Sequence, residues 1–271
     1  SIDYRNNRQV IAATDANSLP EPNTFENWAS TLVEYVFDNS LPKGLNLYNG
    51  TMAKVFAEYS KQIDKKNTNF YVVGFDARYY QKIHRDFIWA NRIAASTSFG
   101  DQRLIYYLGG VDSWFLPRFN TSTNIDNTQN YAYQTLATNM RGFIQNARNG
   151  NSFAVINSEL RLPVFKYFLK RNLSSDFIQN FQVVSFADIG TAWNGTTPYS
   201  DDGPTNTLQV GNAQTPLIIT INATNNPIIG GFGWGLRSRL WGYFVRVDRA
   251  WGVQDGNVLK PITYLSLSLD F

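Results

Sequence analysis

Three oppositely charged residues are the first candidates for chemistry in this chain. Arg141 stands in the tripeptide Arg141-Gly142-Phe143, where a long polar stretch ends, and Glu159 and Asp188 follow in two strand-like runs. A guanidinium can donate two parallel hydrogen bonds to one carboxylate, which suits arginine better than lysine to such a pair. The sequence therefore indicates an ion-pair site.

The alternation of the two runs predicts that both acids face the same way. Successive side chains of a strand point to opposite faces of a sheet. In the first run the polar parity holds Asn157, Glu159 and Arg161, and the other holds Ala154, Ile156, Leu160 and Leu162. In the second run one parity holds Gln182, Asp188 and Gly190, and the other holds Val183, Ala187 and Ile189. We expect Glu159 and Asp188 on one polar face, one strand apart.

The alternative interpretation is that Arg141, Glu159 and Asp188 are three unrelated polar residues. No set of residues typical of a catalytic triad accompanies them. The single histidine, His84, stands in a turn beside Arg85 and Asp86 and cannot by itself make a His-rich metal site. We therefore expect no catalytic residues, no metal and no cofactor, and we do not expect an enzyme.

The composition favours a protein whose surface is only partly in water. Of 271 residues, 17% are charged and 15% are aromatic, so charge is scarce and aromatic side chains are abundant. The net charge of +3 comes without a basic block, and we expect no nucleic-acid partner. The chain has no cysteine, which excludes disulfides and thiolate metal sites.

Long alternating runs predict an all-β fold. Eleven strand-like runs are visible: 2–13, 28–37, 45–63, 70–83, 87–99, 103–111, the two runs that carry Glu159 and Asp188, 228–240, 241–251 and 261–271. Most are longer than the five or six residues (roughly) of a soluble strand and long enough for the ~9–11 residues that cross a bilayer. A large soluble β-sandwich would also alternate, but with shorter strands. The pattern favours a transmembrane antiparallel up-and-down β-barrel.

The alternation also assigns an outward, lipid-facing side. We expect this side to carry Val33, Tyr35, Val55, Tyr59, Val73, Phe75, Ile156, Leu160, Val245, Leu265 and Leu267. The glycines of 230–235 predict strand curvature, because glycine inside a strand marks a bend or a close backbone approach. The short apolar run 217–221 is either a loop hairpin or a strand extension.

Four features together resemble the Omp85 superfamily, also called the bacterial surface antigen family. They are the Arg-Gly-Phe at 141–143, the strand with Glu159, the segment Phe186-Ala187-Asp188-Ile189-Gly190, and the terminal Phe271. The resemblance covers most of the chain and is strongest over 108–271. Met140 stands where the family usually has valine or isoleucine.

The resemblance implies one outer-membrane barrel domain over 1–271, with the loop 111–150 folded into the lumen. In the family the arginine at the loop tip meets acidic residues of the inner wall, which implies a loop lock made of Arg141, Gly142, Phe143, Glu159, Asp188 and Gly190. Such barrels usually have about sixteen strands, and closed bacterial barrels have an even number. We therefore expect the chain to be the C-terminal portion of a barrel whose first strands, and any periplasmic domain such as POTRA repeats or a propeller-like domain, lie upstream.

The function that the resemblance implies is insertion or translocation of proteins at the bacterial outer membrane. One side of the seam between first and last strands would be the final strand, with Leu265, Leu267, Leu269 and Phe271. The partners would be outer-membrane lipids and β-barrel client proteins or subunits of an envelope complex. Two alternatives stay open: an accessory barrel of a larger envelope complex without insertase activity, and a passive pore.

Overall fold

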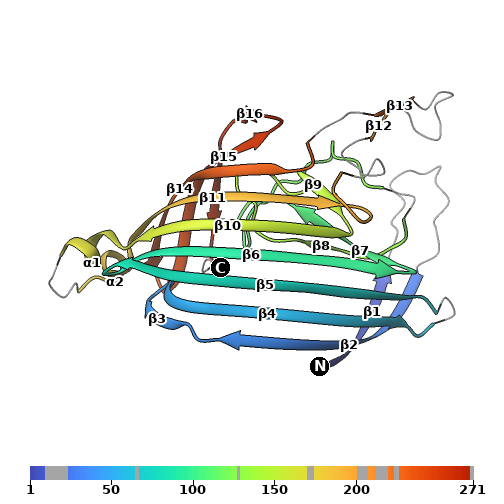
Figure 1. The fold of residues 1–271 in the computed structure, drawn as a ribbon, viewed down its shortest axis with the longest axis horizontal. Helices are drawn as coiled ribbons and strands as arrows, with labels where there is room; N and C mark the ends of the chain where they lie inside the picture. The colour runs from blue at the N-terminus through green and yellow to red at the C-terminus, as the bar shows by residue number, and fades with distance from the viewer. Residues whose placement is uncertain are drawn as a thin grey trace.

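The computed structural model describes residues 1–9, 24–64, 67–126, 129–169, 174–199, 207–210, 219–222 and 226–268 and is an all-β, mostly antiparallel up-and-down structure (Figure 1). Alternation builds it: residues of one parity pack against an inner layer, and residues of the other parity lie exposed.

One sheet of twelve strands forms the main wall. Its main strands, in spatial order, are β1 (Ile2–Gln9), β2 (Thr24–Asp38), β4 (Leu47–Gln62), β5 (Asn69–His84), β6 (Phe87–Gly100), β10 (Ser152–Leu162), β11 (Gln182–Trp193), β14 (Ile229–Leu240), β15 (Tyr243–Gln254) and β17 (Ile262–Ser266). Two short strands complete hairpins, β3 (Leu41–Gly44) against β4 and β16 (Asn257–Val258) against β15. β3 lies in the connection between β2 and β4.

The expected wall strand at 103–111 is wrong. β6 pairs directly with β10, and β7 (Arg103–Leu108) leaves the wall to form a separate sheet with β8 (Tyr131–Leu136) and β9 (Arg148–Gly150). All five residues from Leu104 to Leu108 are buried, so this strand has no exposed face to alternate with. Without this strand the eleven expected wall strands become ten, the number left in the main sheet when β3 and β16 are set aside.

The segment that leaves the wall is also longer than the expected loop 111–150. It begins after β6 and ends before β10, so it spans 101–151 and contains β7, β8 and β9. We call it the inner segment, and we call the wall face that it covers the inner face. β7 contacts β6, β10 and β11, and β9 contacts β10 and β11. Buried apolar residues join the two layers, among them Leu104, Tyr106, Leu108, Met140 and Phe143 of the inner segment and Phe70, Val72, Phe153, Val155 and Ile229 of the wall.

The outer face is apolar and exposed over most of the wall. Ten of the eleven residues expected there are exposed, and Val245 is half-buried. The register therefore agrees with the alternation, since a slip by one residue would have reversed every strand.

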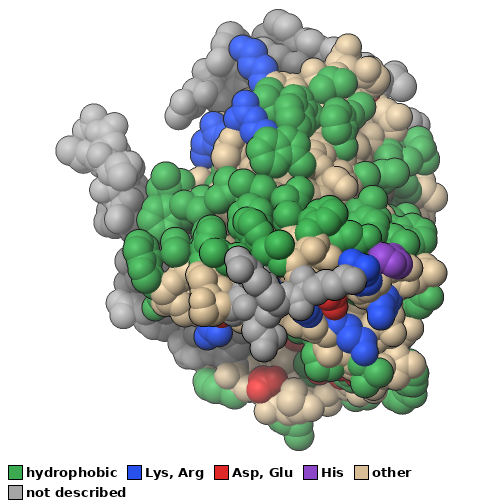
Figure 2. All heavy atoms as spheres, turned by 90° about the vertical axis from the view of Figure 1, so that its left-hand side faces the viewer, with side chains coloured by type: hydrophobic (Ala, Val, Ile, Leu, Met, Phe, Trp, Pro, Cys, Tyr) green, Lys and Arg blue, Asp and Glu red, His purple; other side chains and the backbone are tan. Residues whose placement is uncertain are grey.

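The two ends of the wall differ in their connections. Short turns after β2, β5 and β14 lie at the end drawn on the left of Figure 1, together with α1 (Val164–Phe168) and α2 (Asp176–Asn180), which join β10 to β11 and were not expected. Figure 2 shows hydrophobic side chains gathered over this end, with Lys and Arg side chains among them. No helix in the described part of the chain is long and apolar enough to cross a membrane.

The opposite end carries the longer connections. The inner segment enters there, and so does the link between β11 and β14, which holds a hairpin of β12 (Thr207–Val210) and β13 (Ile219–Asn222). Of the apolar run 217–221, the described residues 219–221 belong to a loop hairpin. The expected N-terminal strand 2–13 is described as far as Gln9 and pairs only with β2, so β1 is an edge of the described sheet, and β1 and β17 do not pair within it.

Candidate functional site

Arg141 and the two acids meet on the inner face. Glu159 lies on β10 and Asp188 on β11, where Asn157 is opposite Asp188 and Glu159 is opposite Phe186. The acids are thus diagonal neighbours on the inner face. The inner segment, which covers this face, places Arg141 against both of them. All three side chains are at most 2% exposed.

Asp188 is the main partner of Arg141. Its Oδ2 accepts from Nε of Arg141 at 2.7 Å and from the backbone N–H of Arg141 at 3.1 Å. Its Oδ1 accepts from Nη2 of Arg141 at 2.7 Å and from Nδ2 of Asn157 at 2.8 Å. The guanidinium carbon lies 3.7 Å from the centre of the Phe186 ring, so the ring face adds cation–π attraction. The arginine is thereby held in one orientation.

Glu159 is shared by three arginines. Nη1 of Arg141 hydrogen-bonds to its Oε1, Nε of Arg161 donates to its Oε2 at 2.8 Å, and Nη2 of Arg237 lies 3.7 Å from Oε1. The cluster continues to Asp248 on β15, which lies 3.0 Å from Nη1 of Arg237 and 3.6 Å from Nη2 of Arg246. Four arginines and three carboxylates therefore form one buried cluster along β10, β11, β14 and β15.

The contacts of the cluster leave little capacity for acid–base chemistry. An ionised carboxylate has about four lone-pair sites, and four donors occupy Asp188. Each of the three carboxylates faces at least one guanidinium. Among the described residues no group of three or more His, Cys, Asp or Glu side chains could hold a metal ion. The arrangement is suited to fixing the inner segment to the wall.

Gly142 and Phe143 are held by the last strand. The N–H of Gly142 donates to the hydroxyl of Tyr264 at 2.9 Å, and that hydroxyl donates to the carbonyl of Phe143 at 2.8 Å. The carbonyl of Phe143 also accepts from the N–H of Gly110 at 2.9 Å. Gly142 has a φ of 95°, which glycine adopts without strain. We call Arg141, Gly142 and Phe143 together the loop tip.

Glycines on β14 and β15 make room for the loop tip. A Cβ at Gly231 would overlap the carbonyl oxygen of Arg141, and a Cβ at Gly252 would lie 2.6 Å from the carbonyl oxygen of Gly142. The glycine run 230–235, which we interpreted as curvature, thus also serves close approach. At Gly190 a Cβ would instead lie 2.9 Å from Cγ2 of Val155 on the neighbouring strand β10 and 3.4 Å from Cδ2 of Leu108 on β7.

A second polar contact anchors the inner segment further along the wall. Asp76 of β5 accepts from Arg92 of β6 at 2.6 Å and from Arg78 at 2.9 Å. Nη1 of Arg92 also donates to the hydroxyl of Thr138 at 2.6 Å. Polar contacts away from the loop tip therefore also attach the segment to the wall.

Of the other expected site residues, Leu265 and Leu267 lie exposed on the outer face, whereas Leu269 and Phe271 fall outside the described residues. Sequence reasoning did not single out Arg161, Arg237, Arg246, Asp248 or Tyr264. A signal existed for each, because all five have the inner-face parity of their strands. A charged or tyrosine side chain at such a position needs a partner when it is buried.

Comparison with known families agrees with these features. A family model described as the Omp85 superfamily domain matches residues 2–256, nearly the whole chain. No curated protein matches the chain.

Replacing Arg141 should release the loop tip. Arg141→Ala leaves Asp188 and Glu159 buried without their shared partner, and breaking a buried pair costs about 3–5 kcal/mol. Arg141→Lys should behave like alanine, because one ammonium cannot reproduce the fork on Asp188 together with the bond to Glu159. We expect faster chymotrypsin cleavage within 101–151 in both variants. The wall should stay folded, which heat-modifiability of the protein on gels would show. Cleavage as slow as in the wild type would show that the cluster does not hold the segment.

A matched pair of glycine variants tests the close approach. Gly231→Ala places a methyl group against the carbonyl of Arg141 and should cost roughly 1–3 kcal/mol through overpacking. Gly230→Ala changes the neighbouring residue, where the nearest atom is Cβ of Val253 at 3.8 Å, and should be tolerated. Chymotrypsin sensitivity of the inner segment is the measurement. Equal sensitivity of the two variants would contradict the docking argument.

Proposed function

Because the chain belongs to the Omp85 superfamily, we propose that it forms part of an outer-membrane β-barrel that inserts or translocates other proteins. Proteins of this superfamily occupy the outer membranes of bacteria or organelles and work in protein insertion or translocation. For this chain the bacterial outer membrane, lipid contacts and β-barrel clients are the corresponding proposals. The observation that carries them is the match to the family over a wall with an apolar outer face and a charged inner face.

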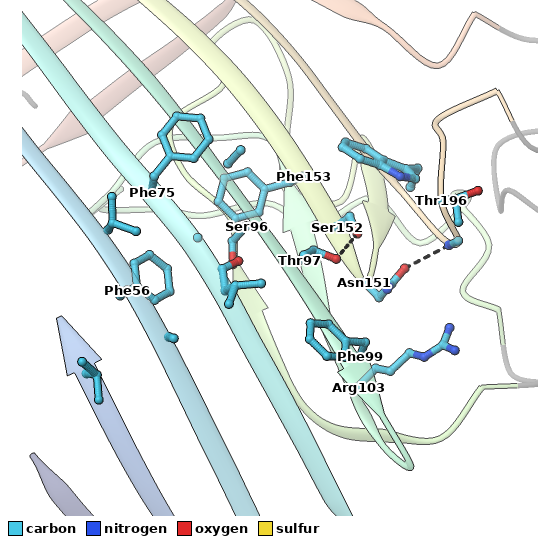
Figure 3. A pocket seen from close by; sticks show the side chains of 18 of the residues that line it. Phe56, Phe75, Ser96, Thr97, Phe99, Arg103, Asn151, Ser152, Phe153 and Thr196 are labelled. Atoms are coloured by element: carbon cyan, nitrogen blue, oxygen red, sulfur yellow. Dashed lines mark hydrogen bonds between the residues drawn. The ribbon is translucent and has the colours of Figure 1, made fainter. Parts of the chain in front are cut away.

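The outer face supports a place in a bilayer. β2, β4, β5 and β6 have 15, 16, 16 and 14 residues, more than the ~9–11 that a tilted strand needs to cross the hydrocarbon. A water-soluble monomer rarely exposes so continuous an apolar surface. Val33, Tyr35, Val55, Val73 and Phe75 also line a hollow of about 1070 Å³, which extends to Phe56, Ser96 and Phe153 (Figure 3). Lipid chains would cover the part of this hollow that lies on the outer face.

The connections support an orientation. Outer-membrane barrels have short periplasmic turns and longer extracellular loops. The end with α1 and α2 and the short turns would then face the periplasm, and the inner segment would enter from outside. In a closed barrel of about sixteen strands, the number that the family implies, the inner face becomes the lumen and the inner segment fills it.

In this setting the buried cluster acts as a loop lock. Arg141 joins the inner segment to Glu159 on β10 and Asp188 on β11, and Tyr264 joins the same tip to the last strand. The edge of β17 that does not face β15 would form one side of the seam. An unpaired edge can accept another strand by β-augmentation, which is the physical basis for templating a client.

Two other functions remain as alternatives within the same fold. An accessory barrel would keep the lock without assembling clients. A passive pore is disfavoured by the inner segment, which packs on the inner face through an apolar layer as well as through charges. Single-channel conductance of the full-length protein, compared with a variant lacking 115–149, would separate a pore from a plugged barrel.

Client assembly is the direct test of the proposed function. The full-length protein would be reconstituted in phospholipid vesicles, and folding of a small unfolded outer-membrane barrel would be followed by heat-modifiability on gels. We expect faster client folding than in protein-free vesicles and in vesicles that hold an unrelated barrel. Equal rates in all three would favour the accessory function.

Two arginine substitutions on one strand test the bilayer placement independently of activity. Phe75 lies in the middle of β5 and Ile83 near its end, and both are exposed on the outer face. Phe75→Arg should destabilise the reconstituted protein by about 2–4 kcal/mol, and Ile83→Arg by about 1 kcal/mol or less, because the cost depends on depth. Urea unfolding in vesicles measures both. Equal losses would argue against a bilayer around this face.

A further inference from the structure

The outer edge of β17 is not free over its whole length. One side of β17 pairs with β15, and on its other side Trp114 of the inner segment forms an isolated antiparallel bridge with Ser266. The N–H of Phe115 donates to the carbonyl of Leu265 at 2.8 Å. This bond joins the residue after Trp114 to the residue before Ser266, as it would in a continuing antiparallel strand. A short piece of the same chain therefore occupies the edge.

The side chains of this piece extend both faces of the wall. Phe115 and Leu116 are 63% and 71% exposed, and the chain from Trp114 to Arg118 lines a hollow of about 430 Å³ with Thr263 and Leu265, whose side chains lie on the outer face. Trp114 instead packs inward on Tyr264, with ring centres 4.8 Å apart. The piece thus imitates a wall strand, with one apolar residue to each side.

Pro117 limits the length over which this piece can pair with β17. Pro117 has no N–H, so it cannot donate to the edge, and its ring fixes the backbone of the chain beyond Leu116. A longer strand would offer more backbone hydrogen bonds to β17 and would displace this piece.

We propose that residues 113–116 are an edge cap, an autoinhibitory contact that keeps the outer edge of β17 closed to other strands until one displaces it. This inference rests on the proposed function, because only in that function does a client strand bind the uncovered edge. Tyr264 links the cap to the lock, because its ring packs on Trp114 and its hydroxyl binds Gly142 and Phe143. Release of the loop tip removes support from the cap.

Two substitutions of Phe115 separate the effect of the cap's backbone hydrogen bond from the effect of its side chain. Phe115→Pro removes the N–H that donates to Leu265, whereas Phe115→Ala keeps it and removes only the side chain. Hydrogen exchange of residues 262–268 in the reconstituted full-length protein is the measurement. We expect exchange about two- to tenfold faster in the proline variant, corresponding to one lost hydrogen bond, and little change in the alanine variant. Equal exchange in the proline variant and the wild type would overturn the cap.

A disulfide tests whether the cap must move. The chain has no cysteine, so Trp114→Cys with Ser266→Cys introduces a single pair. Opposite residues between hydrogen bonds of an antiparallel pair have Cα atoms about 4.5 Å apart, which a disulfide can span. Trp114→Cys with Thr263→Cys is the register control and should not cross-link. We expect the oxidised pair to stop client assembly and a reductant to restore it.

The outcomes separate the cap from the proposed function. Assembly that continues with the disulfide closed would overturn the cap as a gate. If the wild type assembles no client but Phe115→Pro exposes the edge amides, the cap stands and the proposed function fails. If neither variant alters exchange while the wild type assembles clients, the function stands and the cap is wrong.

Discussion

The buried charge of Arg141 is the interaction on which the arrangement of the inner segment depends. A guanidinium away from water is stable only where carboxylates and hydrogen-bond acceptors surround it. Asp188 and Glu159 supply these from two adjacent strands, and the backbone N–H of Arg141 joins the same carboxylate. Because the donors and acceptors match in one geometry, the loop tip has one register on the wall. Apolar packing alone, which is not directional, would allow it to slide.

The two faces of the wall differ in composition, and this difference accommodates the loop tip. Bulky apolar residues lie on the outer face, whereas glycines and charged residues lie on the inner face beside the loop tip. The same alternation that suits a bilayer outside thus leaves space and polarity inside. A side chain at Gly231 or Gly252 would occupy the volume that the tip backbone fills.

Alternation revealed the faces, the outer residues and the common face of Glu159 and Asp188, because these depend on period two within single strands. The contact of Arg141 with the two acids was indicated instead by its charge, its place at the end of a polar stretch and the family resemblance. Alternation failed at β7, where both faces are buried and the run Leu-Ile-Tyr-Tyr-Leu has no period to read. It also could not show that β6 pairs with β10 across a segment of about fifty residues, since sequential strands are neighbours only about two-thirds of the time. The edge contact of Trp114 depends on tertiary placement and leaves no local pattern.

The glycines that admit the loop tip also weaken the sheet that holds it. Glycine inside a strand costs roughly 0.5–1 kcal/mol relative to alanine, and Gly231, Gly233, Gly235 and Gly252 all lie on β14 and β15. These strands connect the wall to β17, so the last hairpin relies on contacts from the inner segment through Tyr264, Arg141 and the charged cluster. The tip and the final strand therefore stabilise one another, and any event that frees the tip also loosens the edge of the wall at which the described sheet ends.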